Sequence, residues 1–127
     1  MPPLDDPLIS RRHPGADPRD RLITLEEIAG TAAPRGYAAL RIEPAPDGAP
    51  PAAWLTRLRV GAADRGHGLG RRLLREAADE ARRAGAVRLS ADLGDVSGGA
   101  AGDAAGWLLA AGFTPDTHRA GVLRLAL

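Results

Sequence analysis

The clearest alternation of hydrophobic and polar positions begins at residue 36. Within residues 36–43, Ala38, Leu40 and Ile42 alternate with aromatic or charged positions. A period of two is typical of a strand with one buried face. The proline-rich stretch at 44–51 cannot continue that strand, because proline lacks the N–H that a sheet ladder needs. We therefore predict a strand over 36–43 followed by a connecting loop.

A second alternating segment follows the loop. Over residues 54–60, one set of alternate positions is Trp54, Thr56, Leu58 and Val60. The intervening positions carry Leu55 and two arginines. We expect a second strand here, antiparallel to the first, with those four side chains on one face.

The periodicity then changes from two to that of a helix. The apolar positions that repeat at helical spacing are Leu69, Leu73, Ala77, Ala81 and Ala84. Charged residues occupy the other positions, and Gly85 follows as a typical helix stop. The sequence predicts an amphipathic helix over residues 69–84.

The C-terminal third repeats the change between strand and helix. Residues 87–92 read as a strand, and a glycine-rich connector leads to a helix at about 103–111 that ends at Gly112. The final residues, 122–127, read as a closing strand. From residue 36 onward the predicted order is therefore β-β-α-β-α-β, an α/β or α+β domain without internal repeats.

The N-terminal region is rich in Pro, Asp and Arg, so we predict a mobile arm over residues 1–20 and a single domain over 21–127. The apolar pair of Leu8 and Ile9 could place one short strand within that arm. Residues 24–30 carry a capping-box pattern, from Thr24 to Glu27, that suggests a short helix. Leu22 and Ile23 could instead begin a strand.

Composition excludes several kinds of chemistry. The chain has no Cys, and all 17 basic residues are Arg. Disulfides, thiol nucleophiles, Walker-type phosphate loops and lysine bases are therefore absent. Three histidines, widely separated in sequence, do not indicate a metal site, so we expect none. Ala, Gly and Pro supply 53 of the 127 residues, which predicts a core of small side chains.

Charge and hydropathy bear on partners and location. The formal net charge is +1, which argues against a broad nucleic-acid footprint. No apolar run is long enough to span a bilayer, and the first residues are acidic where a signal peptide would be basic. We expect a cytoplasmic protein with no membrane partner, and a homodimer is compatible with the sequence.

The most informative segment joins the second strand to the long helix through a glycine-rich turn. Backbone N–H groups of such a turn, together with the helix N-terminus, suit a phosphate or pyrophosphate. Arg71, Arg72 and Arg75 lie in the first turns, where the helix dipole disfavours cations unless an anion is bound. The alternative is a solvated face with surface pairs at i,i+4 spacing, namely Arg72–Glu76 and Asp79–Arg83.

The pattern Arg65-x-x-Gly68-x-Gly70, following Leu58-x-Val60, closely resembles the coenzyme A loop of the GCN5-related N-acetyltransferase (GNAT) superfamily. The resemblance extends from about residue 36 to the C-terminus. It implies a three-layer α+β fold, with a mixed, mostly antiparallel sheet flanked by helices and a shortened N-terminal region. The residues it assigns to the pyrophosphate are Arg65, Gly66, His67, Gly68, Leu69, Gly70 and Arg71. Those it assigns to the pantetheine arm, through their backbone, are Leu58, Arg59 and Val60.

The sequence departs from the family pattern at several positions. Where the family often has a tyrosine that protonates the departing thiolate, this chain has Leu108, and where an Asn is common it has Ala101. Residues 54–60 lack the usual carboxylate. By analogy, Asp92 and His118 are the titratable groups best placed to move a proton, although a strand-end cap and a surface loop residue are the alternative readings.

The resemblance implies an acetyl-CoA-dependent N-acetyltransferase that moves an acetyl group to a primary amine of a small molecule or peptide by direct attack on the thioester. No metal is expected in that chemistry. The lost tyrosine and short N-terminal region leave two alternatives open. The chain could be a catalytically degenerate coenzyme A binding or sensor module, or half of a larger transferase.

Overall fold

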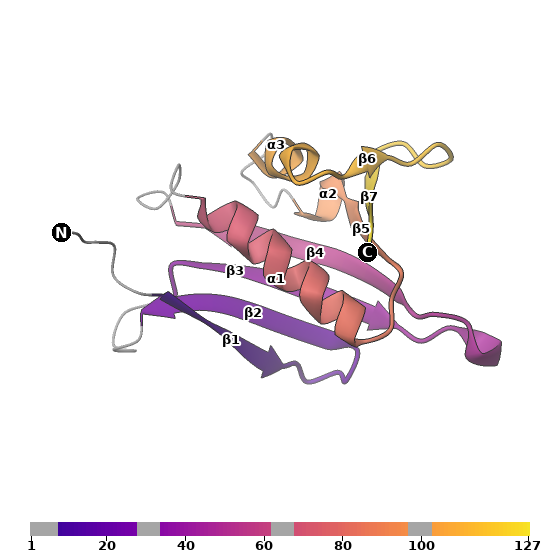
Figure 1. Ribbon diagram of the computed structural model, residues 1–127, viewed down its shortest axis with the longest axis horizontal. Helices are drawn as coiled ribbons and strands as arrows, with labels where there is room; N and C mark the ends of the chain where they lie inside the picture. The colour runs from indigo at the N-terminus through magenta and orange to yellow at the C-terminus, as the bar shows by residue number, and fades with distance from the viewer. Residues whose placement is uncertain (1–7, 28–33, 62–67, 97–102) are drawn as a thin grey trace.

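The computed structural model describes residues 8–27, 34–61, 68–96 and 103–127. These residues form a seven-stranded sheet in the order β1-β2-β3-β4-β5-β7-β6, with α1 lying across it (Figure 1). The strands are β1 (Leu8–Pro14), β2 (Asp20–Glu27), β3 (Gly36–Glu43), β4 (Ala52–Val60), β5 (Arg88–Asp92), β6 (Thr114–Pro115) and β7 (Val122–Ala126). The helices are α1 (Leu69–Arg83), α2 (Leu93–Val96) and α3 (Asp103–Ala110), and a 3₁₀ turn, η1, spans Pro46–Gly48. Every pairing is antiparallel except that of β4 with β5.

The first described strand corrects the predicted boundary at residue 20. β1 pairs with β2 along its whole length, from Leu8 opposite Glu27 to Pro14 opposite Arg21. The Arg12 guanidinium also donates to two glutamates of α1, at 2.9 and 2.8 Å. Residues 8–20 thus belong to the domain rather than to a mobile arm, because β2 offers them a complete ladder. Residues 1–7 lie outside the described part.

The prediction of a short helix from residue 24 is wrong for residues 24–27. These residues belong to strand β2, which runs to Glu27. Ile23 and Leu25 are both fully buried, while Glu26 lies on the opposite face. Ladder partners on both sides, β1 and β3, outweigh the local capping pattern. The alternative reading, a strand beginning near Leu22, is the one that the structure shows.

The predicted hairpin of β3 and β4 is confirmed, but a bulge in β4 changes its faces. Ala39 pairs with Arg57 whereas Leu40 pairs with Leu55, so Thr56 is the extra residue. Leu55 and Leu58 consequently both face the core. Trp54 lies on the other face. Strict alternation predicted that Trp54 and Leu58 share a face, and the bulge shows that prediction to be wrong.

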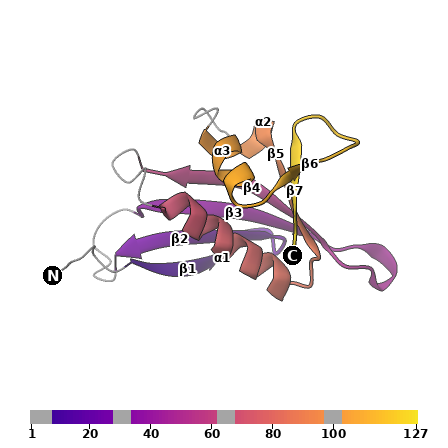
Figure 2. The same ribbon diagram turned by 45° about the horizontal axis from the view of Figure 1, so that its top comes forward.

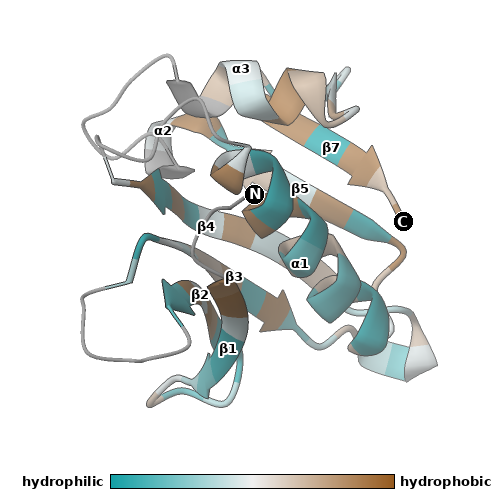
Figure 3. Cartoon of the chain, turned by 60° about the vertical axis from the view of Figure 1, so that its left-hand side comes forward, coloured by the Kyte–Doolittle hydropathy of each residue, from teal (hydrophilic) through white to brown (hydrophobic). Residues whose placement is uncertain are grey.

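The core lies between one face of the sheet and helices α1 and α3. Its largest fully buried side chains are Ile23, Leu25, Leu40, Leu55, Leu73, Leu74, Leu89 and Leu108. Alanines of α1 complete the contact, as the composition predicted. The side of α1 that faces away from the sheet is hydrophilic (Figure 3). The expected α+β class, with a mostly antiparallel sheet flanked by helices, is confirmed.

The opposite face of the sheet, which we call the open face, has no helix packed on it among the described residues. β1 and β2 are joined by only residues 15–19, which are too few for helices, so the described part has two layers rather than three. Polar side chains suit this exposure, and Arg41, Glu43 and Asp20 form ion pairs there. None of the helices in the described segments has the length and apolar character needed to cross a bilayer.

Candidate active site

Strands β4 and β5 lie side by side at their beginnings and then diverge (Figure 2). Their parallel pairing covers only Ala53 to Leu55 on β4. Beyond that point, β4 has β3 as its only strand partner within the described residues. The predicted backbone-binding residues Leu58, Arg59 and Val60 therefore lie on an edge of β4 that the sheet leaves free.

The side chains of this segment explain why its backbone is held in place. Leu58 and Val60 are 4% and 5% exposed and point into the core. Arg59 points away from the core and is exposed. A bulged strand with anchored side chains presents its backbone N–H and C=O groups along the free edge, where an extended ligand could pair as an additional strand.

The N-terminus of α1 lies beyond that edge, and no side chain among the described residues caps it. Gly68 is the N-cap residue, with φ at +79°, and its carbonyl accepts the Arg72 N–H at 3.0 Å. The first turn contains no acidic residue, and a Cβ added at Gly68 would meet nothing within 4 Å. The described part of the chain thus gives the first-turn N–H groups no side-chain acceptor, and the positive end of the helix dipole lies behind them. The predicted contacts Arg65, Gly66 and His67 lie outside the described residues.

Two arginines near this helix start are free to meet an anion. Arg71 and Arg75 are exposed and have no ionic partner in the part of the chain that the structure describes. Both line a groove of about 420 Å³ between α1, α3 and β7. Two unneutralised guanidinium groups beside a helix N-terminus favour a polyanionic ligand.

The i,i+4 surface pairs of the alternative interpretation do not form among the described residues. Arg72 donates instead to the carbonyl oxygen of Leu8, at 2.9 Å, and so ties α1 to β1. Glu76 accepts from Arg12. Asp79 pairs with Arg82, at i,i+3 spacing, instead of with Arg83 at i,i+4. The structure offers these groups tertiary or i,i+3 partners, which a helical wheel alone does not show.

Gly70 has a packing role that the turn pattern did not reveal. A Cβ built on Gly70 would lie 3.0 Å from the Trp107 ring. Trp107, on α3, is partly buried against the core, so the absence of a side chain at Gly70 lets α1 and α3 approach closely.

We expect Gly70→Ala to lower the free energy of unfolding, because either the ring or the helix must move, and overpacking costs about 1–3 kcal/mol. The matched control is Gly106→Ala on α3, where an added Cβ meets nothing within 4 Å. That change should raise stability by about 0.5–1 kcal/mol. Urea unfolding of both variants measures the difference, and equal effects of the two substitutions would contradict the close contact with Trp107.

The two titratable candidates each sit in a turn. Asp92 ends β5 on the open face, and its Oδ1 accepts the Gly94 N–H at 2.9 Å. His118 is exposed in the β6–β7 connection, and its backbone N–H donates to Asp116 Oδ1 at 2.7 Å. Each candidate thus has a local structural contact. These contacts fit the alternative roles, a strand-end cap for Asp92 and a surface loop residue for His118.

Asp116 is the acidic residue that holds this connection together. Its side chain is 1% exposed and pairs with Arg124 at 2.8 Å. The backbone N–H of His118, followed by the Arg124 charge, lowers the pKa of Asp116 from its ordinary value. No sequence pattern indicates this pair, because the two residues lie on different elements.

A lowered pKa in the folded state means that Asp116 contributes stability above the unfolded pKa of about 3.9 and loses it as pH falls further. Asp116→Asn should therefore lower the urea midpoint at pH 7, and its difference from the parent should shrink as pH falls below about 4. The control Asp79→Asn removes an exposed carboxylate and should change little. A pH-independent loss in Asp116→Asn would contradict the contribution of its charge.

Trp54 is the residue near the site that sequence reasoning placed wrongly. The Arg119 guanidinium lies over its ring, 5.3 Å from the centroid. The bulge at Thr56 puts Trp54 on the open face. A break in strict alternation after Leu55 is the sequence signal that could have predicted this placement. Leu108, where the family pattern has tyrosine, is fully buried, and Ala101 lies outside the described residues.

Comparison with known proteins bears on this arrangement. Residues 3–98 match the model of the Acetyltransferase (GNAT) family. A search of curated proteins gives no significant match. A GNAT-family protein from Desulfovibrio desulfuricans is 18% identical, with a TM-score of 0.67 over 94% of this chain and 99% of its own.

Two further solved structures have similar folds. An IAA acetyltransferase from Bacillus cereus is 16% identical, with a TM-score of 0.67 over 95% of this chain and 100% of its own. AtaTR bound with acetyl-CoA is 19% identical, with a TM-score of 0.66 over 85% of this chain and 68% of its own. At these identities the structures show a shared fold.

Proposed function

Since the chain belongs to the acetyltransferase (GNAT) family and is accordingly an N-acyltransferase, we propose that it transfers an acetyl group from acetyl-CoA to a primary amine of a small molecule or peptide. The observation that carries the proposal is the free edge of β4 leading to the uncapped start of α1. An extended thiol arm and a pyrophosphate fit these two features in that order.

The binding roles follow from the geometry of each part. We assign the pantetheine arm to the backbone of Leu58, Arg59 and Val60, and the pyrophosphate to the first-turn N–H groups after Gly68. Among the described residues, Leu69 and Gly70 supply such groups, and Arg71 adds a charge. Arg65, Gly66 and His67 complete the proposed loop by the sequence pattern alone.

The reaction needs little from side chains. The neutral amine nitrogen attacks the thioester carbonyl carbon, a C–N bond forms, and the C–S bond breaks with its electron pair on sulfur. The amine loses one proton and the thiolate can take one up. Backbone donors on the β4 edge can stabilise the developing oxyanion, and one such donor is worth about 2.7–4 kcal/mol of barrier. Positioning supplies much of the remaining rate.

The pH dependence of turnover tests the absence of a phenol acid. With Leu108 buried at the family's tyrosine position, we expect kcat/KM to rise about tenfold per pH unit below the pKa of the acceptor amine. A pH–rate profile for a simple alkylamine measures this. A bell-shaped profile whose alkaline limb disappears in His118→Ala would show that His118 acts as an acid.

A second candidate function follows from the same residue. Because Leu108 replaces the usual acid, the chain could bind coenzyme A as a sensor without turnover, or act as half of a larger transferase. We favour turnover, since a sensor needs the pyrophosphate turn but has no use for the free, anchored edge of β4. Solution mass bears on the larger transferase, and also on a homodimer.

A further inference from the structure

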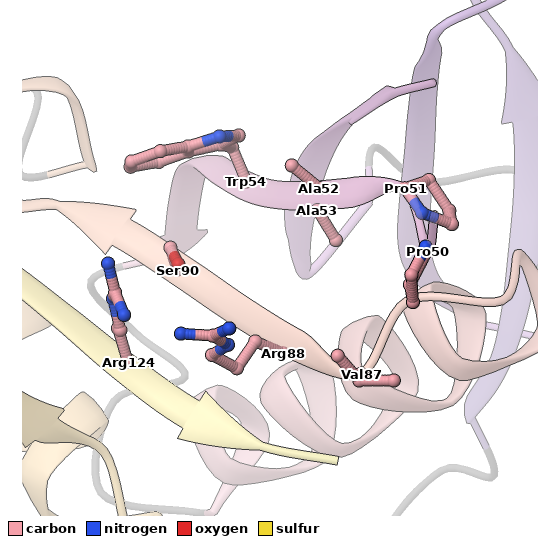
Figure 4. Close-up of a pocket in the computed structure, with 9 residues that line it drawn as sticks. All are labelled: Pro50, Pro51, Ala52, Ala53, Trp54, Val87, Arg88, Ser90 and Arg124. Carbon is pink, nitrogen blue, oxygen red and sulfur yellow. The ribbon is translucent and has the colours of Figure 1, made fainter. Parts of the chain in front are cut away.

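A pocket of about 350 Å³ on the open face lies between the beginnings of β4 and β5. The proposed function uses none of its lining residues. Trp54 and Pro51 form its apolar side, while Arg88, Ser90 and Arg124 supply polar groups (Figure 4). Its size suits part of a small molecule.

The pocket has more positive charge than its carboxylates neutralise. Arg88 is exposed and has no ionic partner among the described residues. Arg124 emerges from the neighbouring strand beside it and pairs with a single carboxylate, Asp116. The Nε of Arg124 is buried without a hydrogen-bond partner in the described part of the chain. Adjacent like charges on one sheet face are unfavourable unless an anion joins them.

Arg119 does not line the pocket but contacts one of its lining residues, Trp54. Its guanidinium carbon lies 5.3 Å from the centroid of the Trp54 ring, which makes a cation–π contact. A guanidinium has five N–H donors, so one in a cation–π contact can still donate to a carboxylate. The pocket thus offers convergent donors beside an aromatic wall.

A carboxylate marks the other end of the same strand. Asp92 follows Ser90 by two positions on the open face of β5, close to where β4 and β5 diverge. At about 3.3 Å per residue, Asp92 lies about 7 Å beyond Ser90 and about 13 Å beyond Arg88. Positive charge at one end and negative charge at the other suit a ligand with a carboxylate and an amine.

We propose that this pocket binds the anionic group of the acceptor, which is a primary amine carrying a carboxylate about 7–13 Å from its nitrogen. The inference rests on the proposed function. The carboxylate is held by Arg88, Arg119 and Arg124, and the amine extends along β5 toward Asp92 and the free edge of β4.

Turnover with amines of graded length tests the proposal. We expect kcat/KM for 6-aminohexanoate to exceed that for hexylamine at least about tenfold, as one charged hydrogen-bonded contact warrants. β-Alanine, which is too short to reach both ends, should be poor. Arg88→Ala should reduce the preference for the carboxylate, whereas Arg83→Ala, which removes an exposed charge from α1, should retain it. Equal rates for 6-aminohexanoate and hexylamine would overturn the proposal.

Direct binding separates this inference from the proposed function. N-acetyl-6-aminohexanoate cannot react, so calorimetry with it reports the pocket alone, and Arg88→Ala should weaken its binding at least about fivefold. Binding without turnover of any amine would support the pocket and contradict the transferase. Turnover of hexylamine without binding of N-acetyl-6-aminohexanoate would support the transferase and contradict the pocket. Arg88-dependent binding of a short RNA, with none of the small carboxylate, would also overturn the proposal.

Discussion

Replacing Leu108 by Ala is expected to lower the free energy of unfolding by about 2–5 kcal/mol. Leu108 is fully buried where α3 meets the sheet, so the change removes apolar contacts and leaves a cavity. Because small domains are stable by only about 5–15 kcal/mol, this is a large share of the total. Urea unfolding followed by circular dichroism measures it.

The matched control is the next residue of the same helix. Leu109 is 53% exposed, and Leu109→Ala keeps the helix propensity equally favourable. Its effect should stay within about 0.5 kcal/mol. Similar losses in both variants would contradict the placement of Leu108 in the core, and would reopen this position to a role at the site.

The second large effect concerns the start of α1. Gly68→Asp should weaken acetyl-CoA binding at least about tenfold relative to Gly68→Asn. Asp and Asn both tolerate the positive φ of this position better than other side chains, and the space around it is open. The two variants differ mainly in one negative charge, which would face the proposed pyrophosphate.

Calorimetry with acetyl-CoA measures both affinities, and urea unfolding checks that the two variants are equally stable. The pair is a better probe than Gly70→Glu, since Gly70 packs against Trp107 and a change there disturbs the fold as well. Equal affinities for Gly68→Asp and Gly68→Asn would remove the pyrophosphate from the start of α1.

The sequence predicted those elements whose periodicity and stop signals agree. α1 ends where Gly85 stops it, with φ at +94°, and its apolar face is the buried one. The hairpin of β3 and β4 was equally clear. The bulge at Thr56 was not, because one extra residue exchanges the two faces without changing the composition of the strand.

Elements that depend on partners distant in sequence were the ones missed. β1 looks like a polar arm until β2 supplies its ladder and α1 supplies glutamates for Arg12. The ion pair of Asp116 with Arg124 joins the β6–β7 connection to β7 and forms only in the folded sheet. At the candidate site, the glycine pattern located the start of α1, while the pocket beside Trp54 required the fold.

The most direct test of the central claim is release of free thiol from acetyl-CoA in the presence of a panel of primary amines, with acetyl-CoA supplied below its dissociation constant for the parent. Gly68→Asp is the weakly binding variant, Gly68→Asn is its uncharged match, and a sample without protein is the blank. We predict amine-dependent release by the parent and by Gly68→Asn that clearly exceeds release by Gly68→Asp. Saturable acetyl-CoA binding by the parent, with no amine raising thiol release above the blank, would contradict the transferase and support a sensor.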